Sequence, residues 1–370
     1  MLCNQGLLYV YVKRRCVICF ALRLKSCKVT DTALTYDDGH MPSMTDTPIP
    51  YRKRFAFLAG FIAGPTVGLL LLAALARYLP DRSVFQVIGR VADSVAPQML
   101  VVVVGLALVI ALLGAWRSGL LIVLGAVVAA GYIGWKHTER TIALVPEASV
   151  DLRVLWFNML NENWLPPEEI AAGLVASGAD VVVLGEAVKI TGQMRALREV
   201  FPFQVGCLQF CAVVMLSKYP LEAARQGRLS PISPERYIRA RVVTEAGEVT
   251  LIGSHLIKPW FDRLSTDEAH RLSHRIEVVE GPVVLVGDMN AAPWSRRMVH
   301  LHQDTGLRFA PLPPATWPAR AGALGVPIDH VMVGGGAGFV SLLPWGADMG
   351  SNHLGLLAEI TLDAHQPSGN

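Results

Sequence analysis

Three long apolar stretches near the N-terminus restrict what this chain can fold into more than any other feature. Residues 55–76 carry no charged side chain, residues 99–116 form a second stretch, and residues 120–135 form a third. About 20 apolar residues are enough for a helix to cross the hydrocarbon core of a bilayer. The chain is 52% hydrophobic and 17% charged, below the ~25% charged residues of average soluble proteins. We therefore predict a membrane anchor of three transmembrane helices within residues 51–140.

Two details of these stretches predict how the helices pack. Only Arg117, Ser118 and Gly119 separate the second stretch from the third, which predicts a tight helical hairpin at these residues. Within the first stretch, glycine recurs at every fourth position, at Gly60, Gly64 and Gly68. Small residues at this spacing leave a smooth face on which another helix can approach closely.

The basic residues predict the orientation of the anchor. Arg52, Lys53 and Arg54 directly precede the first stretch, and positively charged residues next to a span favour the cytoplasmic side. Three crossings then place the remainder of the chain outside the cytoplasm. Arg77, Arg82 and Arg90 fall in the loop that this topology places outside, and they favour the opposite orientation. We expect a multi-pass protein of a bacterial inner (plasma) membrane with an extracytoplasmic C-terminal part.

Residues 1–50 are interpreted as an N-terminal tail. Their short apolar stretches are interrupted by Lys13, Arg14 and Arg15, which is not the order of charge and apolar residues in a secretory signal. Met41 or Met44 is an alternative start of the chain. Four of the six cysteines lie in this tail. The remaining pair, Cys207 and Cys211, is compatible with either a disulfide or two buried thiols.

Residues 151–362 have the pattern of a separate α/β domain, followed by a short tail at 363–370. Apolar, β-branched stretches predict strands, and amphipathic stretches with proline or acidic residues at their start predict helices. The strands are expected within residues 151–160, 179–187, 211–221, 237–257, 283–288, 327–335 and 356–362, and the helices at 166–178, 192–200 and 266–280. Several strands are apolar throughout, as strands buried on both faces are. We predict a two-sheet α/β sandwich flanked by helices.

Polar side chains recur where these strands end. Asp288 and Asn290 follow the apolar stretch "VVLVG", and side chains two apart on an extended chain point the same way. Taken alone, they are also ordinary turn residues. The same pattern is found at several other strand ends or starts, at Asn158, Glu186, His255, Asp329, Asn352 and His353. Because unpartnered buried polar groups are costly, we expect these side chains to converge on one site for a cation and a substrate.

The ordered set of these motifs resembles the endonuclease/exonuclease/phosphatase superfamily. The resemblance rests on Asn158, Glu186, "SHL" at 254–256, "GDMN" at 287–290, "IDHVMV" at 328–333 and "SNHLGL" at 351–356, with "LSKYPL" at 216–221 as a framework segment. It covers essentially all of residues 151–362, and the three spans resemble those of a bacterial membrane-anchored subgroup. The superfamily includes deoxyribonucleases, sphingomyelinases and inositol-polyphosphate phosphatases. It implies a metal-dependent hydrolase of phosphoester bonds.

The resemblance also implies a cation site. Glu186 matches the metal-binding glutamate, and Asn158 lies beside it as a metal or phosphate ligand. Mg²⁺ is the expected ion, with Mn²⁺ as a substitute, because both prefer oxygen ligands. Asn352 stands where the superfamily usually has an aspartate. Its amide oxygen can still serve as a ligand but carries no charge, which implies weaker metal binding.

The remaining roles follow from the same resemblance. Asp288 would orient or deprotonate the attacking water, and Asn290 would hold a phosphate oxygen. His353 would lie beside the scissile phosphate, with Asp329 accepting its other ring proton. His255 matches a second histidine that contacts the phosphate or assists the leaving group.

Three further groups have two interpretations each. Trp260 either lines the mouth of the substrate site or packs on its own loop. His270 and His274, four residues apart, suit a zinc site in spacing, but their neighbours predict a solvated helix face. Arg296 and Arg297 are expected at a solvated helix start, with contact to an anionic substrate as the alternative.

Charge bears on the substrate. Residues 1–150 contain 15 Lys and Arg against 8 Asp and Glu, whereas residues 151–370 contain 18 against 22. The second part therefore has no basic excess of the kind that binds a nucleic acid backbone. We predict a phosphodiesterase or phosphatase that acts on a lipid-linked or small phosphorylated substrate, with nucleic acid disfavoured. The alternatives are a nuclease of the same superfamily, or a catalytically silent membrane protein that binds a phosphorylated ligand, which Asn352 would favour.

Overall fold

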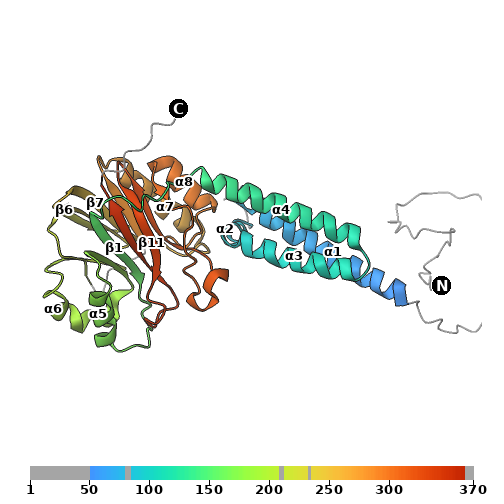
Figure 1. Ribbon diagram of the computed structural model, residues 1–370, viewed down its shortest axis with the longest axis horizontal. Coiled ribbons are helices and arrows are strands. Elements are labelled where there is room, and N and C mark those ends of the chain that lie inside the picture. Colours follow the sequence, from blue (N-terminus) through green and yellow to red (C-terminus); the bar gives the residue numbers. More distant parts are fainter. Residues whose placement is uncertain (1–50, 80–84, 208–211, 232–234, 363–370) are drawn as a thin grey trace, which may run out of the picture. The chain divides into compact units, whose positions relative to one another are not determined.

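The computed structural model describes residues 51–79, 85–207, 212–231 and 235–362 (Figure 1). The chain divides into Met1–Pro48 and Ile49–Asn370, and everything below concerns the second unit. The expected N-terminal tail with its four cysteines, the alternative starts Met41 and Met44, and the tail at 363–370 lie outside the described residues.

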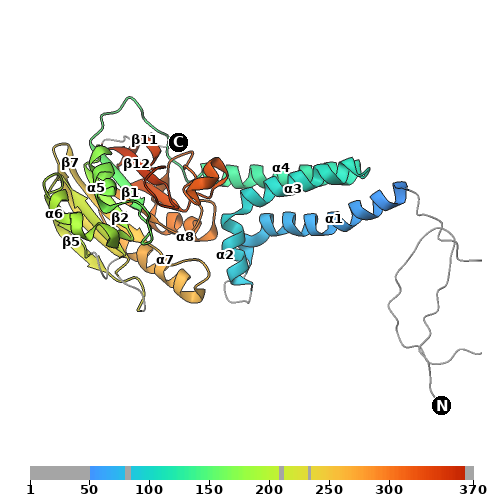
Figure 2. The same cartoon turned by 90° about the horizontal axis from the view of Figure 1, so that it is seen from below.

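Four helices form the N-terminal part of this unit: α1 (Tyr51–Leu75), α2 (Gln86–Ser94), α3 (Ala96–Leu112) and α4 (Trp116–Thr138). Residues 76–78 extend α1 as a 3₁₀ turn. Helices α1, α3 and α4 run side by side (Figures 1 and 2) and enclose a core that includes Val103, Ala107 and Ile110. Two helices, Phe55–Tyr78 and Trp116–Thr138, are long and apolar enough to cross a membrane. The number rises to three if α2 and α3, which meet at a bend of 78°, make one broken span.

The predicted hairpin turn is wrong by a few residues. Arg117, Ser118 and Gly119 lie in the first turn of α4, which begins at Trp116, and the chain turns just before that residue. Gly114 adopts a positive φ of 96° there, which glycine does at little cost. Gly119 instead lies where two helices touch, because an added Cβ would lie 2.6 Å from the carbonyl oxygen of Ala107.

The predicted packing face of α1 is also wrong. A Cβ added at Gly60, Gly64 or Gly68 would meet nothing within 4 Å, so none of the described helices packs closely on these glycines. The buried positions of α1 are Ala59, Thr66 and Ala73, spaced every seven residues. The regular spacing of glycines in the sequence therefore did not predict which side of α1 faces the neighbouring helices.

The rest of the unit is a sandwich of two six-stranded sheets, as predicted. The first sheet has the order β11-β12-β1-β2-β4-β3 and the second β5-β6-β7-β8-β10-β9. In the first sheet the strands are β1 (Leu152–Asn158), β2 (Val181–Gly185), β3 (Phe203–Val205), β4 (Val213–Ser217), β11 (Gly338–Trp345) and β12 (Gly355–Thr361). In the second they are β5 (Leu221–Gly227), β6 (Tyr237–Thr244), β7 (Gly247–His255), β8 (Val283–Asp288), β9 (Arg308–Phe309) and β10 (Asp329–Gly334).

Helices cover the two outer faces of the sandwich. The first sheet carries α5 (Pro167–Ala176), a 3₁₀ helix (Ala187–Gln193) and α6 (Met194–Leu197), and the second carries α7 (Asp262–Glu277) and α8 (Arg296–Thr305). Separate apolar clusters fill the three layers: one between the sheets around Trp156, one under α5 around Phe157, and one under α7 and α8 around Leu272. Because β1 is buried on both faces, its side chains Trp156 and Phe157 belong to different layers.

Strands were predicted best where they are apolar throughout. The edge strand β5, of sequence "LEAARQG", was not predicted, because it is largely exposed and has no apolar alternation. The short strands β3 and β9 and the strand β11 were missed as well. Of the helix expected at 192–200, the first two residues end a 3₁₀ helix and residues 194–197 form the single turn α6.

Cys207 is disulfide-bonded, which agrees with the first of its two interpretations. Cys211 lies outside the described residues.

Gly253 lies at a close approach of the two sheets and provides a test of this packing. A Cβ there would lie 2.7 Å from Val183 and 3.0 Å from Val213, both on the opposite sheet. Overpacking a close-packed core typically costs ~1–3 kcal/mol. We expect Gly253→Val to lower the free energy of unfolding of the sandwich by about that amount, measured by urea denaturation with tryptophan fluorescence. Gly192→Val is the control, because Gly192 has open space around it; equal losses in both variants would contradict the packing argument.

Candidate active site

The predicted polar residues meet at one edge of the sandwich because of strand direction and register. Strands β1 and β2 run parallel and pair Asn158 with Gly185, so Glu186 follows at the same edge. Strands β7 and β8 also run parallel and pair His255 with Asp288. Strand β10 is antiparallel to β8, which places its first residue, Asp329, opposite Asp288.

Asp329 forms the most buried interaction of the site. Its Oδ2 is 2.8 Å from Nδ1 of His353, and its Oδ1 accepts a hydrogen bond of 2.8 Å from Nε1 of Trp156. Burial acts to raise the pKa of Asp329, but the attraction and hydrogen bond of His353, with the Trp156 hydrogen bond, outweigh it and lower the pKa. Burial acts in turn to lower the pKa of His353, and Asp329 outweighs it, with help from Asp288 and Glu186, raising the pKa to about 9. The pair is therefore a carboxylate and an imidazolium at neutral pH.

Asp288 lies beside Asp329 and His353, but its pKa is shifted in the opposite direction to that of Asp329. Its Oδ1 accepts the backbone N–H of Asn290 at 2.8 Å, and its Oδ2 accepts Nδ2 of Asn158 at 3.1 Å. Burial, and then the charge of Asp329, raise the pKa of Asp288 to about 7. This carboxyl group therefore changes protonation near neutral pH, where a general base is most effective.

His255 faces two carboxylates but is held neutral. Its Nε2 lies 3.5 Å from Oδ2 of Asp288 and 3.9 Å from Oε1 of Glu186. Burial, and then the nearby charges of Arg236 and His353, lower the pKa of His255 to about 3. Its Nδ1 is buried without a hydrogen-bond partner among the described residues. The ring is thus a neutral hydrogen-bonding group.

Two residues of the site have left-handed backbones. Glu186 has a φ of 51° directly after β2, and Asn290 has a φ of 48° after β8. Such conformations are unusual for residues other than glycine and concentrate at functional sites. Each changes the direction of the chain at a strand end. The Glu186 side chain is 24% exposed and accepts the backbone N–H of Asn161, and the Asn290 amide donates to the carbonyl of Leu256.

The chemistry of this set fits a divalent cation. Ligand atoms of Asp288, Asp329 and His353 lie within 4.8 Å of one another. Oxygen donors predominate at the edge, which suits a hard ion. The Asp329 carboxylate is already engaged by His353 and Trp156. The pKa of Asp288 is raised by burial and then by the charge of Asp329, and a cation nearby would favour its charged form.

Two predicted residues lie outside this cluster. The side chain of Asn352 is exposed, and its hydrogen bond to the chain is made by its backbone carbonyl, which accepts the N–H of Ala319. Trp260 is 54% exposed, with the Lys258 ammonium over its ring. The structure therefore brings together Asn158, Glu186, His255, Asp288, Asn290, Asp329 and His353 but leaves Asn352 and Trp260 facing outward.

Sequence reasoning missed two supporting residues. Trp156 was interpreted only as part of an apolar strand. The sequence does not indicate which acceptor its indole N–H will meet in the folded protein. Ser351 was quoted within "SNHLGL" without a role, yet its hydroxyl donates to the Asn158 carbonyl at 2.7 Å and accepts the His353 N–H at 3.0 Å. It fixes the backbone that carries His353 next to the strand that carries Asn158.

Comparisons with known proteins agree with this geometry. The model of the Endonuclease/Exonuclease/phosphatase family matches residues 155–353, which include all seven converging residues. No curated protein matches this chain.

Solved structures similar to this chain come from several organisms. An endonuclease/exonuclease/phosphatase from Beutenbergia cavernae is 18% identical with a TM-score of 0.47, covering 58% of this chain and 72% of that one. A D. rerio TDP2 complexed with single-strand DNA product is 15% identical with a TM-score of 0.48, covering 57% and 98%. Sphingomyelinase C from Streptomyces griseocarneus is 19% identical with a TM-score of 0.42, covering 56% and 98%.

His330 follows Asp329 in the chain and is buried, and the effect of this burial on its pKa can be tested. Its Nε2 lies 2.7 Å from the Ala291 carbonyl and its ring packs on Phe309; burial lowers its pKa to about 4. In the unfolded chain this histidine takes up a proton near pH 6.5, whereas in the folded chain it stays neutral until the pH falls to about 4. The neutral ring therefore contributes its full stabilisation of the fold above pH 6.5, and this stabilisation is lost as the pH falls towards 4. At 1.36 kcal/mol per pKa unit, the loss is roughly 3 kcal/mol.

We expect His330→Gln to flatten the fall of the unfolding free energy between pH 6.5 and 4, measured by urea denaturation at a series of pH values. His274→Gln is the control, because His274 is exposed. An unchanged slope in His330→Gln would show that this histidine titrates normally in the folded protein.

Proposed function

Because the chain belongs to the endonuclease/exonuclease/phosphatase family, we propose that it is a membrane-anchored, divalent-metal-dependent phosphoesterase. The observation that carries the proposal is the buried Asp329–His353 pair beside Asp288, at the edge where both sheets end. Its substrate is a lipid-linked or small phosphorylated molecule outside the cytoplasm.

The proposed metal site uses oxygen donors at this edge. Glu186 would hold the ion, with Asn158 beside it, and Mg²⁺ is proposed first, with Mn²⁺ as a substitute. Asn352 was predicted as a further ligand; its exposed side chain gives no support to that role. When bound, such an ion supplies positive charge that stabilises the charge developing on phosphate oxygens.

The protein's own side chains supply the proton chemistry. Asp288, with a pKa near 7, accepts a proton from the attacking water, and its hydrogen bonds to Asn158 and Asn290 orient it. His353 is positively charged and has its Nδ1 occupied by Asp329, so its other ring nitrogen is left to donate to a phosphate oxygen or leaving group. His255, being neutral, acts as a hydrogen-bond partner of the phosphate rather than as a charged acid.

Membrane anchoring and charge support the substrate proposal. Helices α1 and α4 are able to span a bilayer, and residues 151–370 have more acidic than basic side chains. The prediction against nucleic acid receives no support from the comparisons, because the similar structures include both a sphingomyelinase and a protein bound to single-strand DNA. A nuclease therefore stays as the second candidate in the experiment below.

We expect purified full-length protein to hydrolyse a phosphoester in the presence of Mg²⁺ or Mn²⁺ and to lose the activity in EDTA. Asp288→Asn and His353→Gln should each reduce the rate by ~10²–10⁴-fold, the usual contribution of acid–base catalysis. The assay compares a lipid phosphate, a chromogenic phosphodiester and plasmid DNA at low salt. His274→Gln should retain full activity, and activity in the two site variants equal to wild type would contradict the proposal.

Orientation is tested by reporter fusions. An odd number of spans puts the catalytic domain on the side opposite the N-terminus, and two spans put both on one side. The disulfide at Cys207 supports the outward orientation, because disulfides persist in oxidising compartments. We expect alkaline phosphatase fused after residue 362 to be active in a bacterial host, and green fluorescent protein at the same position to be dark. The reverse pattern would place the domain in the cytoplasm.

A further inference from the structure

A large apolar cavity, called the interhelical cavity below, lies between helices α1 and α4, beside the bend at which α2 meets α3. Its volume is about 430 Å³, whereas an engineered apolar cavity of roughly 150 Å³ already binds benzene. Helix α1 contributes Leu70 and Ala74 to its walls, and α4 contributes Val128 and Ala129. It shares no residue with the proposed active site.

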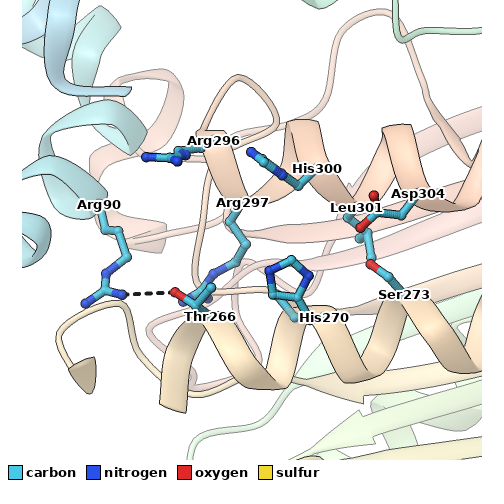
Figure 3. Close-up of a pocket in the computed structure, with 10 residues that line it drawn as sticks. Arg90, Thr266, His270, Ser273, Arg296, Arg297, His300, Leu301 and Asp304 are labelled. Atoms are coloured by element: carbon cyan, nitrogen blue, oxygen red, sulfur yellow. Dashed lines mark hydrogen bonds between the residues drawn. The ribbon is translucent and has the colours of Figure 1, made fainter. Parts of the chain in front are cut away.

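A second cavity, between α2, α7 and α8, is of a different kind (Figure 3). Its volume is about 60 Å³, and its walls carry mainly polar or charged side chains, among them Thr266, His270, His300 and Asp304. A long apolar ligand therefore fits the interhelical cavity but not this one.

Two contacts between α1 and α4 set the length of the interhelical cavity. A Cβ added at Gly125 would lie 3.0 Å from the Leu70 side chain, so the helices touch there. The hydroxyl groups of Tyr78 and Tyr132 lie 3.1 Å apart at the other end. Leu70 and Tyr78 are roughly 12 Å apart along α1, because a helix rises about 1.5 Å per residue. The hydrocarbon core of a bilayer is about 30 Å thick, or roughly 15 Å per leaflet, so the cavity matches most of the length of one lipid chain.

The interhelical cavity opens towards the side that lipid would occupy. Leu71, Leu75 and Val128 line it, and each is more than half exposed on a helix that is apolar enough to span a membrane. Such side chains are compatible with lipid tails, which are equally apolar. Ala73 and Ala96 also line the cavity but are only 4% and 2% exposed. A chain that enters from the bilayer therefore contacts residues that bulk lipid does not reach.

Polar groups gather at one end of this cavity. Arg77 and Tyr78 lie where the span of α1 ends, and the Arg77 guanidinium is 5.5 Å from the centre of the Tyr78 ring. Arginine and tyrosine are typical of the boundary between membrane and water. Asp93 lines the same end and attracts Arg77, so this end is polar without an excess of charge. The cavity is thus apolar along its length and polar at the boundary, as a phospholipid is.

We propose that the interhelical cavity binds one hydrocarbon chain of a membrane phospholipid, with its headgroup beside Arg77, Tyr78 and Tyr132. The walls of an empty apolar cavity lose dispersion contacts, and water finds few hydrogen-bond partners there. A hydrocarbon chain restores those contacts. The proposal rests on the membrane anchoring proposed above but not on catalysis.

The experiment reconstitutes full-length protein in phosphatidylcholine nanodiscs that include a phosphatidylcholine with a photoreactive diazirine near the end of one chain. Mass spectrometry after irradiation maps the labelled residues. Ala129→Phe fills the cavity from α4, and Ala74→Leu fills it from α1 and keeps the test decisive if the first variant does not fold. Gly131→Phe is the matched control, because it places the same side chain on α4 where there is open space. Arg77→Gln tests the headgroup end, and Arg117→Gln, exposed at the other end of the helices, is its control.

We expect labelling of wild type at Ala73 and Ala96, as well as at the exposed Val101 of α3, which reports on bulk lipid. Relative to Val101, labelling of the two alanines should fall about tenfold or more in Ala129→Phe, because losing the burial of two methylene groups already weakens binding about tenfold. It should also fall in Ala74→Leu and Arg77→Gln and stay at the wild-type level in both controls.

The proposal is overturned if wild type is labelled at Val101 but not at Ala73 and Ala96, a result that leaves the membrane anchoring intact. It is also overturned if both filling variants are labelled like wild type. Wild-type labelling in Arg77→Gln would overturn the assigned position of the headgroup. Protein that does not enter nanodiscs would contradict the anchoring and this proposal together. Phosphoesterase activity is not measured, so a failure of the catalytic proposal does not alter the result.

Discussion

The carboxylate of Asp329 is the interaction on which the active-site edge depends. It starts β10 of the second sheet, yet its partners are Trp156 of the first sheet and His353, which precedes β12 of the first sheet. A fully buried carboxylate is tolerated only when it is paired and hydrogen-bonded. Both sheets must therefore meet in one relative position for this group to be satisfied, and that position brings the other strand ends together.

Burial at this edge, together with the neighbouring charges, shifts the pKa values of adjacent groups in different directions. Within one edge, the pKa values of Asp329 and His255 are lowered and those of His353 and Asp288 are raised. When the surroundings shift the pKa values of neighbouring groups in opposite directions, one site can provide both a proton acceptor and a proton donor near neutral pH. None of these residues is unusual by type, and the difference arises from which neighbour each one has.

Helix α2 is joined to the segment that follows the site. Ser94, at the end of α2, accepts the N–H of Ala292 on its hydroxyl and the indole N–H of Trp294 on its carbonyl. Ala292 and Trp294 lie two and four positions after Asn290. Residues 141–145, which lie between the helices and the first strand of the sandwich, pair with Phe309 and Phe339. The helices and the sandwich are thus in contact at several points, beyond what a simple tether provides.

The sequence by itself determined the apolar helices, the two-sheet α/β class and the seven polar residues of the edge, because uniform hydrophobicity and its interruptions report burial along a single element. It did not determine which side of an element meets which neighbour. The close helix contact is at Gly119 rather than at Gly60, Gly64 or Gly68, Asn352 faces outward, and Trp156 completes the pair of Asp329 and His353. Those outcomes depend on the register between segments far apart in the chain, and only the packing of the whole fold decides it.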